Sequence, residues 1–81
     1  SAGHATFERE EKIKNFLAAE EEDPLIARNF ISTENLDYLM IDDELRSHPE
    51  YYVNEDFFLE NFAEVASFPS LGNMIIIDLH S

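Results

Sequence analysis

The chain has 81 residues, and its 18 Asp and Glu against 5 Lys and Arg give a formal net charge of −13. A hydrophobic content of 44% excludes a solvated acidic tail, and the absence of Cys excludes disulfides, Cys-based zinc sites and thiol catalysis. No apolar run approaches the ~20 residues of a membrane span, and too few cations are present to follow a phosphate backbone or an anionic lipid surface.

The breaks in the hydrophobic pattern predict an all-α fold, a small bundle of four or five short helices. The length allows a single domain, which we expect to comprise residues 6–81. Residues 1–5 begin with Ser-Ala-Gly-His and are expected to be a leader outside it. The breaks come roughly every ten to fifteen residues, at Asp23-Pro24, Ser32-Thr33, His48-Pro49, Val53-Asn54 and Phe68-Pro69-Ser70.

A first helix is expected over residues 6–19, because Ile13, Phe16 and Leu17 lie on one face at helical spacing. The acidic run Glu20–Asp23 follows it. Carboxylates are unfavourable at the C-terminus of a helix and favourable at an N-terminus. We therefore expect this run to face the start of the second helix rather than to extend the first.

The next helices are predicted from capping residues. Asp23 suits the N-cap of a short, mostly apolar helix over residues 24–31, because a proline follows it at the first helical position. Ser32 or Thr33 is expected to cap a third helix. That helix should carry the stripe Leu36, Leu39 and Met40, end near Ile41-Asp42 and be followed by a short helix over residues 43–47.

A fourth helix should begin after Asn54, a good N-cap, and stop at Pro69. Its apolar arc would comprise Phe58, Leu59, Phe62, Ala63, Val65 and Ala66. Residues 71–80 are ambiguous, because their Ile-rich centre has strand composition while the apolar residues also fall at helical spacing. We favour a helix, since a lone strand has no partner, and a strand here would pair with another chain.

The candidate partner-binding residues surround one aromatic side chain. On a helix, Phe57 lies among Glu60 and Glu64, away from the apolar arc. It could anchor a partner that has a basic rim, or Tyr51 or Tyr52 could fold back and cover it. The two tyrosines could likewise be exposed for binding or fill gaps between helices. The proposed face therefore comprises Tyr51, Tyr52, Phe57, Glu60 and Glu64.

No metal, cofactor or catalytic motif is predicted. The acidic clusters lack the alternating oxygen ligands and central Gly of a calcium loop, and we interpret them as solvated helix starts. His48 and His80 have no metal-ligand spacing, and Gly72 is the only Gly after the leader, so no phosphate-binding loop can form. We expect a protein that is not an enzyme.

The sequence favours a protein-interaction module or a small regulatory inhibitor that binds a basic protein. Two alternatives stay open, an acidic mimic of DNA and a structural piece of a larger protein that forms a homo-oligomer through residues 74–79. Binding to nucleic acid or membrane is not expected. The absence of Cys favours an intracellular location, cytoplasmic or nuclear.

One short segment resembles a known family in part. His48-Pro49-Glu50-Tyr51-Tyr52 is similar to the His-Pro and Tyr-Tyr of the acidic, four-helix colicin immunity proteins. The resemblance implies binding of a basic nuclease through acidic, tyrosine-bearing helices. It covers about five residues and assigns the chain to no family.

Overall fold

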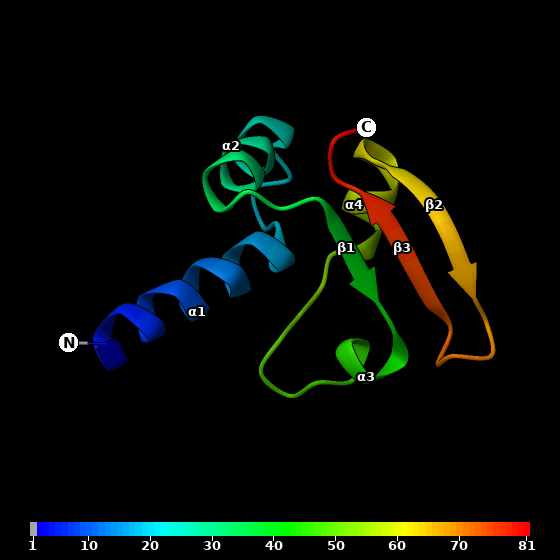
Figure 1. Ribbon diagram of the computed structural model, residues 1–81, viewed down its shortest axis with the longest axis horizontal. Helices are drawn as coiled ribbons and strands as arrows, with labels where there is room; N and C mark the ends of the chain where they lie inside the picture. The colour runs from blue at the N-terminus through cyan, green and yellow to red at the C-terminus, as the bar shows by residue number, and fades with distance from the viewer. Residues whose placement is uncertain (1) are drawn as a thin grey trace.

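The chain is described by a computed structural model that covers the backbone of residues 2–81 and the side chains of residues 9–81. Within that part it is mixed α/β, with four helices and a three-stranded antiparallel sheet, so the expected all-α bundle is wrong (Figure 1). The predicted leader, residues 1–5, lies outside the residues with described side chains. The elements are α1 (Ala2–Ala18), α2 (Pro24–Glu34), β1 (Tyr38–Ile41), α3 (Asp43–Arg46), α4 (Glu55–Asn61), β2 (Ala63–Phe68) and β3 (Met74–Asp78).

The ambiguous C-terminal segment is the central strand of the sheet, whose order is β1-β3-β2. Ile77 pairs with Leu39 of β1 on one side and with Glu64 of β2 on the other. The favoured helix is therefore wrong, and so is the expectation that a strand here would lack partners within the chain. Two segments with helical apolar spacing supply those partners, because long-range pairing outweighs their local preference.

The third helix, predicted to start after Ser32 or Thr33, does not form; the end of α2 and strand β1 occupy that part of the chain. Ser32 and Thr33 do not cap a new helix but lie in the last turn of α2. Asn35 has a left-handed backbone with φ of 57°, and the N–H of Leu36 donates to the carbonyl of Ile31 at 2.9 Å. This is the Schellman arrangement that ends helices, and Asn tolerates it better than most residues. The chain therefore leaves α2 extended and enters β1.

The fourth helix ends earlier than expected. It stops at Asn61, whose side-chain amide donates to the carbonyl of Phe57 at 2.9 Å, and the chain becomes extended at Phe62. The following residues form β2, which pairs with β3 across the short loop 69–73. Gly72 (φ 66°) and Asn73 (φ 49°) both take left-handed backbones in that loop. A short loop that contains Gly between two apolar runs is a hairpin signal.

The predicted starts of the helices that follow Asp23, Asp42 and Asn54 are confirmed, whereas the first helix begins at Ala2 rather than at residue 6. The side chain of Asp23 accepts from the N–H of Leu25 at 2.9 Å, with a proline at the first position of α2. Asn54 accepts from the N–H of Phe57 at 3.3 Å and so caps α4. The short helix predicted over residues 43–47 is α3, which Asp42 caps.

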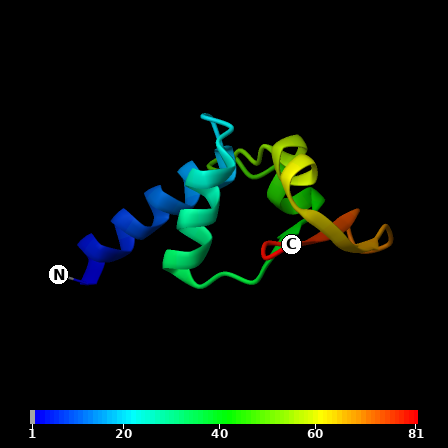
Figure 2. The ribbon, with the colours of Figure 1, turned by 90° about the horizontal axis from the view of Figure 1, so that it is seen from above.

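The core forms where helices α3 and α4 cover one side of the sheet and the α1–α2 pair lies beside β1 (Figures 1 and 2). Phe58 of α4 is fully buried at the junction. Its ring lies 5.2 Å from that of Phe16, edge to face, and 6.0 Å from that of Phe62. Phe16 in turn stacks on Phe30 of α2 at 4.6 Å. The remaining buried core residues are Leu17, Ala27, Ile31, Ile41, Phe57, Ile77 and Leu79.

Candidate functional site

Phe57 is not a surface residue, so its predicted role as an exposed anchor is wrong. Its side chain is only 3% exposed and meets Phe58 edge to face at 5.3 Å. The prediction assumed one apolar arc on a long helix. The short helix α4 instead lies between the sheet and the α1–α2 pair, so the neighbouring rings of Phe57 and Phe58 are both buried.

The other four predicted residues are spread over separate segments. Tyr52 is 69% exposed, whereas Tyr51 is half-buried with its ring 4.9 Å from that of His48. Glu60 is exposed at the end of α4, and Glu64 is exposed in β2. Because α4 ends between the two glutamates, they do not share a helix face as predicted.

A different feature combines acidic and aromatic residues. A cleft of about 420 Å³ opens between the C-terminal half of α1, the α1–α2 loop and α2. We call it the acidic cleft. Its lining comprises Lys12, Asn15, Phe16, Ala19, Glu20, Glu21, Glu22, Asp23, Ile26, Ala27, Phe30 and Phe57.

The floor and the rim of the acidic cleft differ in chemistry. Phe16, Ala27 and Phe57 in the lining are buried core residues, so the floor is continuous with the hydrophobic core. The acidic run Glu20–Asp23 supplies four carboxylates, against the single cation of Lys12. An apolar surface beside several anions suits a ligand that carries both hydrocarbon and positive charge.

The backbone of the rim is strained in two places. Ala19 has φ of 43° and Glu22 has φ of 50°, the left-handed region that costs a residue with a side chain roughly 1–2 kcal/mol. A hydrogen bond from the N–H of Glu22 to the carbonyl of Ala19, at 3.0 Å, closes the turn between them. Strained backbone of this kind occurs at binding sites more often than elsewhere.

Asn54 holds this strained loop against α4. Its backbone N–H donates to the carbonyl of Leu17 at 2.9 Å. Its side-chain amide donates to the carbonyl of Ala19 at 3.5 Å and to Oε1 of Glu22 at 3.3 Å. One residue therefore caps α4 and fixes the acidic rim at Glu22, while Glu20 and Glu21 are exposed.

Sequence reasoning treated the acidic run as solvated charge and missed its apolar neighbour. The available signal was the order of residues, since only Pro24 separates the run from Leu25 and Ile26 at the start of an apolar helix. These two side chains are 72% and 51% exposed, and Ile26 lines the cleft. Exposed apolar side chains beside a charged rim are a feature of protein-binding surfaces.

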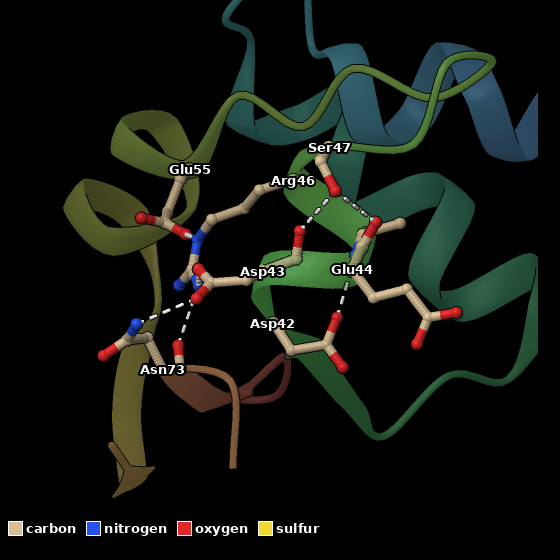
Figure 3. A network of polar contacts seen from close by, with 8 residues as sticks. Asp42, Asp43, Glu44, Arg46, Ser47, Glu55 and Asn73 are labelled. Carbon is tan, nitrogen blue, oxygen red and sulfur yellow. Dashed lines mark hydrogen bonds and ion pairs between the residues drawn. The ribbon is translucent and has the colours of Figure 1, made fainter. Parts of the chain in front are cut away.

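The acidic cluster at α3 has a structural role instead (Figure 3). Arg46 donates from Nε to Oε1 of Glu55 at 2.8 Å, and from Nη1 to Oδ1 of Asp43 at 2.9 Å. It also donates to the carbonyl of Asn73 at 2.8 Å. The hydrogen bond to Glu55 and, to a smaller extent, the one to Asp43 raise the pKa of the guanidinium. Arg46 therefore stays charged while it joins α3, α4 and the β2–β3 loop.

The same network makes one carboxyl sensitive to acid. Hydrogen bonds from Asn73 (2.8 Å) and then Arg46 hold the pKa of Asp43 below its ordinary value of 3.8. A carboxyl whose pKa is lower in the folded than in the unfolded protein stabilises the fold at pH values above its unfolded-state pKa. That stability is lost as the pH falls through its folded-state pKa. We expect Asp43→Asn to be less stable than the parent chain at neutral pH, with the difference shrinking below about pH 4.

Urea unfolding at a series of pH values measures that difference. Glu44→Gln is the control, because Glu44 is an exposed neighbour in α3 that makes no side-chain contact within Figure 3's network. A stability gap between Asp43→Asn and the parent chain that stays constant from neutral pH to pH 3 would contradict the assignment.

Among the residues with described side chains, no group of three or more His, Cys, Asp or Glu is arranged to hold a metal ion. In the same part of the chain, no helix combines the length and the apolar character needed to cross a bilayer. Comparison with protein family models, curated sequences and solved structures gives no match for this chain.

Proposed function

We propose that the protein is an interaction module whose acidic cleft takes a basic, amphipathic segment of a partner protein. The observation that supports the proposal is the pairing of a core-continuous aromatic floor, including Phe16 and Phe57, with the four carboxylates of Glu20–Asp23. The module acts by binding, without catalysis or cofactor. Occupying a partner's basic segment would make it a small regulatory inhibitor, and its lack of Cys suits an intracellular setting.

The chemistry of the cleft favours Lys or Arg flanked by apolar residues. The hydrocarbon stem of either side chain can lie on the aromatic floor while its charged end reaches the rim. The exposed side chains of Leu25 and Ile26 then offer further apolar contact beside the rim. A ligand that is only basic, or only apolar, would use half of these groups and bind less tightly.

The charge of the whole chain assists the encounter. A net charge of −13 attracts cationic partners electrostatically. Salt reduces the range of this attraction, since the Debye length is about 10 Å at 0.1 M ionic strength. Rising salt should therefore lower the association rate more than it raises the dissociation rate.

A paired charge-removal experiment tests the cleft. The probe is a synthetic helical peptide with Lys on one face and Leu on the other, and its affinity is followed by fluorescence anisotropy. Glu20→Gln with Glu21→Gln should weaken binding roughly 3- to 30-fold, as two partly exposed charge contacts imply. Glu60→Gln with Glu64→Gln removes the same charge from the face predicted by sequence, and should change affinity less than about 2-fold.

The two double variants separate three outcomes. Weakening by the Glu20 and Glu21 pair alone supports the cleft. Weakening by the Glu60 and Glu64 pair alone would move the site to the surface at the end of α4 and the start of β2, and equal weakening would reduce the interaction to net charge. Either of the last two results overturns the proposal. As a control, a peptide in which Glu replaces every Lys of the probe should not bind.

A further inference from the structure

The outward side of the sheet is an apolar surface that no helix of the described chain covers (Figures 1 and 2). In the register of the sheet, Met40 lies opposite Ile76 and Phe68 lies opposite Met74. Neighbours along a strand face opposite sides, so these residues share the side away from buried Ile77 and Ile41. We call this surface the outer face; it comprises Tyr38, Met40, Ala66, Phe68, Met74 and Ile76.

The outer face is unusually exposed for its composition. Tyr38 is 62% exposed, Met40 is 56% and Phe68 is 41%. With the half-buried remainder, side chains of these sizes expose on the order of 500 Å² of apolar surface, near the top of the range for the largest patch on a monomer. The largest apolar patch on a monomer is often functional, which makes the outer face a candidate binding surface.

The charge distribution indicates what covers it. The chain carries 18 carboxylates, and the six outer-face residues carry none. Asp78 is the carboxylate that shares their side of the sheet; it lies at the end of β3 opposite Tyr38 and already accepts from the N–H of His80 at 2.9 Å. A basic partner would find almost no anion here. A second copy of this chain presents the same uncharged surface, and on so acidic a molecule two copies meet there with the least repulsion.

We propose that two copies of the chain associate through their outer faces, as a two-fold dimer of stacked sheets. A two-fold interface brings one surface against itself, and packed sheets lie about 10 Å apart with interdigitated side chains. Two patches would bury about 1,000 Å² in total, the lower limit for a specific interface. The dimer should therefore be weak, with a Kd in the micromolar range or above.

The sign of the salt dependence distinguishes this dimer from binding at the acidic cleft. Bringing together two chains of net charge −13 is opposed by repulsion, which salt screens, so salt should strengthen the dimer. Capture of a basic segment should instead weaken with salt. The two surfaces are separate, and the dimer does not depend on the proposed function.

Sedimentation equilibrium over a range of protein concentrations, at about 0.05 M and about 0.5 M NaCl, measures the dimer. The average mass should rise above the 9.4 kDa of the monomer, and more so at the higher salt. Met40→Glu with Phe68→Glu should weaken dimerisation at least 10-fold. Leu25→Glu with Leu59→Glu adds the same charge at exposed apolar positions elsewhere, and should weaken it far less.

A second readout keeps the proposal testable if the outer-face variant fails to fold. In a mixture of isotope-labelled and unlabelled parent chain, nuclear Overhauser contacts between copies should involve the methyl groups of Met40, Met74 and Ile76. A monomer at every concentration and salt, equal effects of the two double variants, or contacts between copies at another surface would each overturn the proposal.

Discussion

Phe58→Ala is expected to destabilise the protein by about 3–5 kcal/mol, the usual cost of deleting a buried phenyl ring. The side chain is fully buried and contacts the rings of Phe16 in α1, Phe57 in α4 and Phe62, the residue between α4 and β2. A domain of this length has a total stability of roughly 4–12 kcal/mol. The variant should therefore lose about a quarter or more of the stability of the domain.

Urea unfolding followed by circular dichroism measures this loss. Leu59→Ala is the matched control, because Leu59 is the next residue of α4 and is 40% exposed. Its loss should stay below about 1 kcal/mol, as expected for a partly exposed position. Equal losses in the two variants would show that α4 does not face the core as described.

Phe57→Ala is expected to cost about 2–4 kcal/mol, somewhat less than Phe58→Ala. Phe57 is also buried, but its ring lines the acidic cleft, so water from the cleft can enter the space that the ring leaves. The result distinguishes the structure from the sequence-based prediction, in which an exposed Phe57 could be removed with little effect on stability.

Tyr52→Ala is the control for the second variant. Tyr52 is 69% exposed, and its replacement should change stability by less than about 0.5 kcal/mol. Equally small changes of the unfolding free energy in Phe57→Ala and Tyr52→Ala would show that the position of α4 between the sheet and the α1–α2 pair is wrong.

Local signals predicted the starts of α2, α3 and α4, although the cap expected at Ser32 or Thr33 was wrong. Asp23 and Asn54 each act within a turn of their own position, so their capping roles did not depend on the rest of the fold. The short helix α3 was predicted for the same reason. Helix ends were harder, because Asn35 ends α2 with a left-handed backbone and Asn61 ends α4 through its side-chain amide, and Asn occurs in turns of many kinds.

The sheet could not be derived from apolar spacing. The segment from Leu36 to Met40 fits a helix stripe, and so do the residues after Phe62, but both pair with β3 once it is present. A strand gains its hydrogen bonds only from partners distant in sequence, and the C-terminal segment has none when the other two segments are taken as helices. Two local signals indicate the sheet: the Ile-rich composition of residues 71–80 and the short loop with Gly72.

The candidate site depended on the same long-range arrangement. Composition alone predicted an acidic surface with aromatic residues, but the residues chosen assumed that Phe57 lay on the outside of a long helix. The acidic cleft joins residues of α1, α2 and α4, and Asn54 fixes its rim from another part of the chain. No spacing rule within one segment brings the Glu20–Asp23 run and Phe57 together.

The central claim, that basic amphipathic segments bind in the acidic cleft, is tested most directly by two-dimensional amide NMR during titration with the Lys and Leu peptide. We predict that the largest shift changes fall on residues 19–27 and on Phe57, and that they diminish when salt is added. Changes that centre on Tyr52, Glu60 and Glu64 while residues 19–27 stay unmoved, or no changes at all, would contradict it.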